Sequence, residues 1–384
     1  MSVSPAKDAP RIEGTVEINN EGPIPDNITT RWVAVSSATA KRAIYGAHPV
    51  KGLYWTKKDV DPSVVFMATH YTADFSEHYF AIPMALRGYG FLGWNTRFSS
   101  AEDKFVLSDA LDDMAAGTAW LEKNTNVKKI IFIGNSGGGP LMAAFAAKVE
   151  SDKSFAVRGP DGFVILNSHP GRADVMTTWL DPSVVDDNDP TNTDPSLDMY
   201  NPVNGPPYSP EFQARYRAAQ IQRNHRITRW AKDELKRLNQ AVTPDRIFNL
   251  FRNFADLRFL DGNIDPSERE IGKCFYGDPK NANRGVPLIA RSSTIRTWLE
   301  MWSLEDSPSR FVKTAPNFKI PVLVLQTTGD ISVFPYDARK LHELVASKDK
   351  ELQFIPGAHF FEESQEELDG GADAIQTWTD KRFH

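Results

Sequence analysis

Residues 134–138, Gly-Asn-Ser-Gly-Gly, have the composition and spacing of a turn that presents a serine for nucleophilic attack. They fit G-x-S-x-G, a sharp connection between a strand and a helix that exposes the serine hydroxyl. Glycines flanking Ser136 suit such a turn, because a Cβ there would collide with the neighbouring strand and helix. An apolar run at residues 129–133 precedes the turn, and an alanine-rich helix with Pro140 in its first turn follows it. This context favours Ser136 as a catalytic residue over a purely structural glycine-rich turn.

A serine hydroxyl is a poor nucleophile at neutral pH and needs an adjacent base that is oriented by an acid. Asp330 lies just past the apolar run 322–326, and His359 lies just after the run 352–355. Open α/β sheets place functional groups just beyond the carboxyl ends of their strands. We therefore predict that Ser136, Asp330 and His359 meet as nucleophile, acid and base.

The elements that must position these residues alternate along the chain. Apolar runs predict strands at residues 31–35, 52–56, 63–69, 90–95, 129–133, 163–167, 322–326 and 352–355. Helical periodicity predicts helices at residues 76–86, 108–123 and 140–150. Strands that alternate with helices indicate an α/β fold with a mostly parallel, doubly wound sheet.

Together, the turn around Ser136 and the segments Gly329-Asp330 and Gly357-Ala358-His359 resemble the α/β-hydrolase superfamily. The resemblance covers about residues 50–169 and 312–384. It implies that Ser136 is the nucleophile and that His359 acts first as a base and then as an acid. It also implies that Asp330 holds the imidazole and stabilises its cation.

The loop after residues 63–69 is where the superfamily usually has His-Gly followed by an oxyanion-hole residue, whereas this chain has His70-Tyr71. We expect one backbone N–H from Tyr71 or Thr72 and another from Gly137 to bind the oxyanion, because the developing charge needs two donors. The alternative is that this loop is only structural. His70 is a candidate substrate-binding residue.

Between residues 170 and 311 the strand pattern disappears, which predicts a mainly helical cap inserted into a core of residues 1–169 and 312–384. We expect cap helices near residues 211–238, 245–259 and 294–302, and a surface loop at residues 181–198. Trp298 and Trp302 are expected to pack inside the cap and to line the substrate pocket. Basic residues on the first cap helix form a solvated face or, alternatively, bind a substrate carboxylate. Asp337 is expected to be a solvated surface group.

Composition excludes several kinds of partner. With 44 basic and 50 acidic residues the net charge is -6, so no chain-wide positive field attracts nucleic acid. The single cysteine, Cys274, permits no internal disulfide, and the start MSVSPAKDAPRIEG lacks the apolar stretch of a secretory signal. The longest apolar runs are far shorter than the roughly 20 residues that span a bilayer. We therefore expect a cytoplasmic protein without a membrane or nucleic-acid partner.

These observations predict a serine hydrolase that cleaves a small-molecule carboxylic ester or lactone through an acyl-enzyme, with no metal or cofactor. The same triad also supports cleavage of an amide, or of a carbon–carbon bond beside a carbonyl. A different alternative is a non-catalytic binding protein that keeps the fold.

Overall fold

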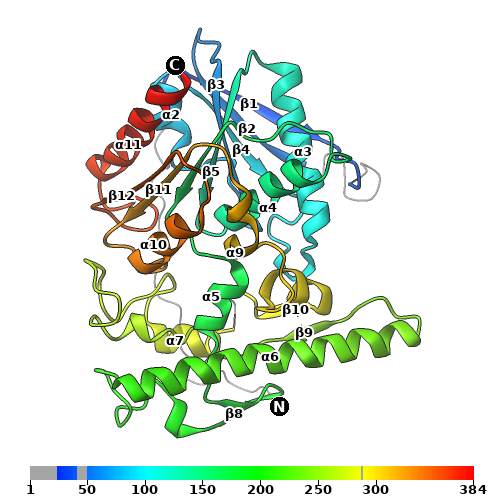
Figure 1. The fold of residues 1–384 in the computed structure, drawn as a ribbon, viewed down its shortest axis with the longest axis vertical. Helices are drawn as coiled ribbons and strands as arrows, with labels where there is room; N and C mark the ends of the chain where they lie inside the picture. Colours follow the sequence, from blue (N-terminus) through cyan, green and yellow to red (C-terminus); the bar gives the residue numbers. More distant parts are fainter. Residues whose placement is uncertain (1–23, 41–49, 287–288) are drawn as a thin grey trace, which may run out of the picture.

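The computed structural model describes residues 24–40, 50–286 and 289–384 of the 384-residue chain. The N-terminal segment used above to argue against a secretory signal lies outside these residues. Eight strands form the main sheet in the order β1-β2-β4-β3-β5-β6-β11-β12 (Figure 1). Their bounds are β1 Ile28–Val35, β2 Val50–Lys57, β3 Val64–His70, β4 Gly90–Asn95, β5 Lys129–Asn135, β6 Gly162–Leu166, β11 Val322–Thr327 and β12 Lys350–Ile355.

The sheet is mostly parallel. Only the ladders that involve β2 are antiparallel, whereas β4, β3, β5, β6, β11 and β12 run parallel to one another. The central strands are buried along almost their whole length. Continuous apolar runs of this kind are typical of parallel strands with both faces covered by helices. The α/β fold with a mostly parallel, doubly wound sheet is therefore confirmed.

Helices pack a separate hydrophobic core against each face of the sheet. One core receives side chains from α3 (Leu107–Asn124), α4 (Gly138–Ser151) and α10 (Pro335–Leu344). The other receives them from α2 (Ala81–Leu86) and α11 (Gln365–Phe383), and Figure 1 shows these two helices on the opposite side from α3 and α4. No helix within the described ranges is both long enough and apolar enough to span a bilayer.

Residues 170–311 separate β6 from β11, and we call this segment the insertion. Figure 1 shows its long helix α6 lying across one end of the molecule. Its elements are α5 Arg172–Trp179, β7 Val184–Asp186, β8 Asp189–Thr193, α6 Pro210–Gln240, β9 Ile247–Asn249, α7 Pro279–Arg284, β10 Ser292–Thr294 and α8 Ile295–Thr297, with a π-helical turn at Trp298–Trp302. The helix α9 (Phe311–Thr314) begins at its end.

Two predictions for the insertion were wrong. Residues 245–259 do not form the expected helix beyond a single 3₁₀ turn at Leu257–Phe259, because β9 pairs with β10 and long-range contacts hold the residues that follow. The backbone N–H of Ala255, for example, donates to Trp179 O at 2.8 Å. Residues 181–198 do not form only a surface loop, since they contain the β7–β8 hairpin and begin at the fully buried Asp181.

The two ends of the insertion lie together, and we call this place the neck. Gly171 and Arg310 form an isolated antiparallel bridge, and the Phe311 N–H donates to Pro170 O at 2.8 Å. Arg310 also forms an ion pair with Asp174 at 2.6 Å. The insertion therefore leaves and rejoins the sheet-forming part of the chain at one point.

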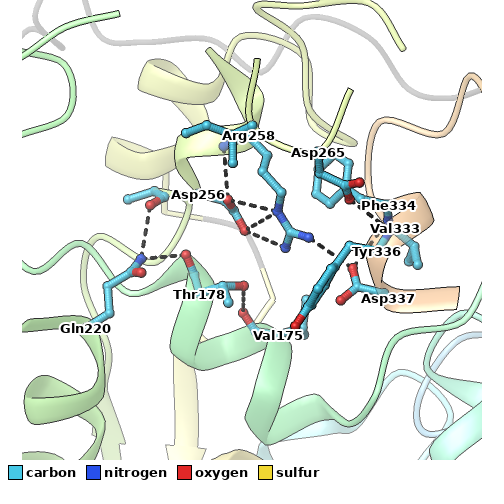
Figure 2. Close-up of polar contacts among 12 residues, drawn as sticks. Val175, Thr178, Gln220, Asp256, Arg258, Asp265, Val333, Phe334, Tyr336 and Asp337 are labelled. Carbon is cyan, nitrogen blue, oxygen red and sulfur yellow. Dashed lines mark hydrogen bonds and ion pairs between the residues drawn. The ribbon is translucent and has the colours of Figure 1, made fainter. Parts of the chain in front are cut away.

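A second contact, which we call the junction, joins the insertion to the segment after β11 (Figure 2). Arg258 lies between Asp256 of the insertion, at 2.8 Å, and Asp337 of α10, at 3.1 Å. The guanidinium also lies 4.0 Å from the centre of the Phe334 ring. The prediction that Asp337 is a solvated surface group was wrong, because its side chain is only 14% exposed and pairs with Arg258.

Candidate active site

Ser136 occupies a strained turn between β5 and α4. Its φ angle is 51°, a left-handed conformation that residues other than glycine rarely adopt. The flanking glycines leave no space for a side chain, because a Cβ on Gly134 would lie 2.6 Å from Gly139 Cα. A Cβ on Gly138 would lie 2.3 Å from Thr69 O. These close approaches explain why the turn needs glycine on both sides of the serine.

Asp330 and His359 form a buried pair. The Nδ1 atom of His359 lies 2.6 Å from Asp330 Oδ2, and neither side chain is more than 4% exposed. The other carboxylate oxygen, Oδ1, accepts the backbone N–H groups of Ser332 at 2.7 Å and Val333 at 2.9 Å. This arrangement fixes the carboxylate and leaves Nε2 of the imidazole free to act on a substrate or a nucleophile.

The electrostatics of the pair favour a protonated imidazole. Burial acts to lower the pKa of His359, but the charge of Asp330 and its hydrogen bond outweigh burial, so the pKa is raised above its ordinary value of 6.5. The histidine can therefore take up a proton from a neighbouring hydroxyl and retain it as the imidazolium.

Ser136 and His359 line one cavity of about 260 Å³. Within the described residues no hydrogen bond joins the Ser136 hydroxyl to His359; in enzymes without substrate such contacts are often long. The aromatic part of the lining comes from Phe75, Trp179, Phe275, Tyr276 and Phe360. The cavity is therefore mainly apolar, with a few polar groups close to Ser136, as small-molecule sites usually are.

The loop after β3 reaches this cavity. His70 and Thr72 line it, whereas the ring of Tyr71 is fully buried behind it and its hydroxyl donates to Ser309 Oγ at 2.7 Å. The N–H groups of Thr72 and Ala73 point at His70 Nδ1, at 3.3 and 3.0 Å. On the opposite side, a Cβ on Gly137 would lie only 2.7 Å from His70 Nε2. The structure thus brings the predicted oxyanion-hole segments and His70 together beside Ser136.

The structure does not bring Trp298 and Trp302 to the cavity. Both indoles are completely buried in the hydrophobic core between the insertion and the sheet. The Trp298 Nε1 atom donates to Thr228 Oγ1 at 3.1 Å. Tyr276 and the neighbouring Phe275, in irregular chain, line the cavity instead, and helical periodicity gave no signal for them.

Two charged residues of the cavity were not recognised from the sequence. Arg172, the first residue of α5, is 4% exposed, and its Nη2 atom lies 3.1 Å from His70 Nε2. Glu102 accepts the backbone N–H of Ala290 at 2.6 Å, and burial raises the pKa of its carboxyl group. Arg172 follows β6 closely, so its place after a strand end was the available signal.

Burial, followed by the positive charge of Arg172, lowers the pKa of both His70 and His169 well below the ordinary value. Both histidines line the cavity. We therefore treat both as neutral at physiological pH, whereas the Arg172 guanidinium carries a formal positive charge near Ser136.

Comparisons with known proteins agree with this architecture. A family model described as the alpha/beta hydrolase fold matches residues 73–363. No curated protein matches the chain. A solved structure of DcsB in complex with its substrate analogue has a TM-score of 0.52 at 12% identity, covering 92% of this chain and 99% of that chain.

Two further solved structures have lower TM-scores. The esterase domain of a Rhodothermus marinus protein has a TM-score of 0.47 at 10% identity, covering 92% of this chain and 98% of that one. A monoacylglycerol lipase from Paleococcus ferrophilus has a TM-score of 0.44 at 18% identity, covering 83% and 95%. The family model matches most of the chain, and its fold agrees with the sheet order and the strained serine turn described above. The chain therefore belongs to the α/β-hydrolase family.

Proposed function

We propose that the protein is a serine hydrolase that cleaves a carboxylic ester or lactone through an acyl-enzyme. The observation that carries the proposal is the strained Ser136 at the strand-to-helix turn, in the same cavity as the buried His359–Asp330 pair. Activation of a serine hydroxyl requires this combination of an exposed nucleophile and an oriented base.

In the proposed reaction His359 takes the proton of Ser136 as the serine oxygen attacks the carbonyl carbon. Collapse of the tetrahedral intermediate breaks the ester bond, and His359 returns the proton to the departing alkoxide. Water then repeats the sequence on the acyl-enzyme, which releases the carboxylic acid and restores Ser136. Asp330 stabilises the imidazolium in both halves through its 2.6 Å contact.

The oxyanion is assigned to backbone donors on two sides of Ser136. Gly137 occupies the N-cap of α4, where a backbone N–H has no partner within the helix and lies at the positive end of the helix dipole. The second donor comes from Tyr71 or Thr72. The N–H of Thr72 already points at His70 Nδ1, which favours Tyr71.

The test is intact-mass labelling with a fluorophosphonate, followed by assays on esters and lactones of increasing size. We expect one adduct on the unaltered protein and none on Ser136→Ala or His359→Ala. Ser332→Ala is the matched control, because Ser332 lines the same cavity without belonging to the triad. It should be labelled as the unaltered protein is.

Absence of an adduct on folded, unaltered protein would contradict the proposal and favour a binding protein of the same fold. An adduct that persists in Ser136→Ala would place the nucleophile elsewhere.

A further inference from the structure

In the part of the chain that the structure describes, Arg172 is a buried cation without a carboxylate partner. Within the described residues it forms no ion pair, and its Nε atom is completely buried without a hydrogen-bond partner. The rings of Tyr71 and Trp302 lie near the guanidinium, each with its centre 5.4 Å from Cζ. Aromatic rings stabilise a cation only partly, whereas a buried cation normally pairs with an anion.

Among the residues that the structure describes, the guanidinium forms its only hydrogen-bond contact with His70, and a neutral His70 cannot neutralise it. Backbone N–H groups can only donate, so the two that point at Nδ1 make this atom the acceptor of the neutral ring. The proton of His70 then lies on Nε2, which faces Arg172 Nη2 at 3.1 Å. Two hydrogen-bond donors, Arg172 Nη2 and His70 Nε2, therefore face each other beside Ser136. Among the described residues, no acceptor receives a hydrogen bond from both of them.

Glu102 does not fill this role. It lines the same cavity, but it lies too far from Arg172 to form an ion pair, and its Oε1 atom is occupied by the Ala290 N–H. Burial raises its pKa in spite of the charge of Arg172. The carboxyl group of Glu102 therefore leaves the guanidinium open to a ligand.

We propose that Arg172, together with His70 Nε2, binds a carboxylate carried by the substrate, and that the enzyme prefers esters or lactones whose acyl half bears this second, ionised group. A guanidinium matches the planar, two-oxygen geometry of a carboxylate, and the hydrogen bonds are charge-assisted. The inference rests on the proposed function, since it names the substrate class of the same site.

The position of Arg172 limits the length of the acyl half. A Cβ on Gly137, the residue after the nucleophile, would lie 2.8 Å from Arg172 Nε and 2.9 Å from Nη2. The anion site thus lies directly beside the point of attack, inside a cavity of about 260 Å³. A carboxylate separated from the scissile carbonyl by one to three carbons fits this arrangement, as in monoesters of short dicarboxylic acids.

The first experiment compares monoethyl succinate with ethyl 4-oxopentanoate, in which a methyl group replaces the charged oxygen. We expect the unaltered enzyme to favour the charged ester in kcat/KM by about 10- to 100-fold, the range of a charge-assisted hydrogen bond. Arg172→Met should abolish this preference, and Arg172→Lys should restore part of it. Arg226→Met is the matched control, because Arg226 lies on α6 and pairs with Asp187. It should keep the preference.

The second experiment measures binding without catalysis. Calorimetry on Ser136→Ala should show that the succinamate anion binds and that neutral succinamide does not. In the double variant Ser136→Ala/Arg172→Met the binding of succinamate should be lost. Fluorophosphonate labelling of Arg172→Met shows whether that variant keeps a folded active site.

The outcomes separate the two proposals. If Ser136 is labelled but charged and neutral esters react equally and succinamate does not bind, carboxylate recognition is overturned and the hydrolase remains. If Arg172→Met slows both esters equally and leaves succinamate binding intact, Arg172 stabilises the oxyanion instead, which also overturns it. If no labelling occurs but succinamate binds, the anion site stands and the hydrolase proposal fails.

Discussion

Arg258 at the junction and Arg172 in the cavity are both buried arginines, but among the described residues only the first has carboxylate partners. Arg258 is held between Asp256 and Asp337 and stacks on Phe334 (Figure 2). Arg172 contacts aromatic rings and a neutral histidine. Arg258 therefore joins two segments of the protein, whereas we propose that Arg172 binds a ligand.

The nearest carboxyl groups differ in the same way. Burial acts to raise the pKa of Asp256, but the charges of Arg217 and Arg258 outweigh burial and hold this pKa below its usual range. The pKa of Glu102 is raised because burial outweighs the more distant Arg172. Pairing with two arginines thus lowers the pKa of Asp256, whereas burial raises the pKa of Asp337 in spite of its contact with Arg258. At the junction two carboxyl groups lie against the arginine, whereas among the described residues no carboxyl group lies against Arg172.

The largest expected effect is on the rate of catalysis when the proposed triad acid is changed. Asp330→Asn keeps an oxygen that can accept the Ser332 and Val333 N–H groups, but it removes the charge that orients His359. We expect kcat for a neutral ester to fall about 10⁴-fold, as for the equivalent change in other serine triads. Stopped assays at saturating substrate measure this, and a thermal melt of the same sample is the control. A rate within tenfold of the unaltered enzyme would exclude Asp330 as the triad acid.

At the junction the expected effect is on stability. Arg258→Met leaves Asp256 and Asp337 without a shared cation, so the free energy of unfolding should fall by about 3 kcal/mol. Urea denaturation followed by tryptophan fluorescence measures the change. Arg237→Met is the control, since Arg237 pairs with Glu234 at the surface and should change stability little. Fluorophosphonate labelling of folded Arg258→Met should be unaltered. A loss of labelling would mean that the junction also positions the triad.

The raised pKa of His359 predicts the pH dependence of the reaction. Because the neutral imidazole is the base, kcat/KM for a neutral ester should rise about tenfold per pH unit on the acid side, with a midpoint above 6.5. The contribution of His359 to the stability of the fold should instead fall as the pH rises. A folded-state pKa above the unfolded value stabilises the fold fully below pH 6.5, and this contribution is lost as the pH rises through the folded-state pKa. A kinetic midpoint below 6.5 would contradict the ion pair.

The smallest expected effect is that of Arg172→Met on stability, and it tests the contrast between Arg172 and Arg258 most directly. Arg172→Met removes a buried charge that has no counter-ion among the described residues, so the free energy of unfolding should change by less than about 1 kcal/mol or increase. The same urea titration measures it beside Arg258→Met. Equal destabilisation by the two substitutions would show that Arg172 is a structural residue, and the contrast between cavity and junction would disappear.

The sheet and the strand ends that carry the proposed triad residues were accessible from the sequence because both depend on local signals. Buried parallel strands are continuous apolar runs, and Ser136, Asp330 and His359 each follow one of them. The strands around Ser136 were therefore recognisable without knowledge of the insertion.

The insertion was less accessible because its structure depends on contacts between distant residues. Residues 245–259 carry apolar residues at helical spacing, yet strand pairing with residues 292–294 prevails. Arg172 is one of 44 basic residues, and its isolation becomes visible only when the segments around the cavity are brought together. Trp298 and Trp302 have the composition of pocket residues, but packing buries them elsewhere.

The neck has a consequence for how substrate range can change in evolution. Because Pro170 and Phe311 are joined by a direct backbone hydrogen bond, the chain between them is a module with adjacent ends. Exchange of this module for that of a relative would replace the part of the pocket wall formed by Arg172, Trp179, Phe275, Tyr276 and Ile289 in one recombination event, and would leave the serine turn untouched. Arg172 lies just inside the module, so a chimaera joined at the neck would acquire the donor's preference for charged or neutral acyl groups.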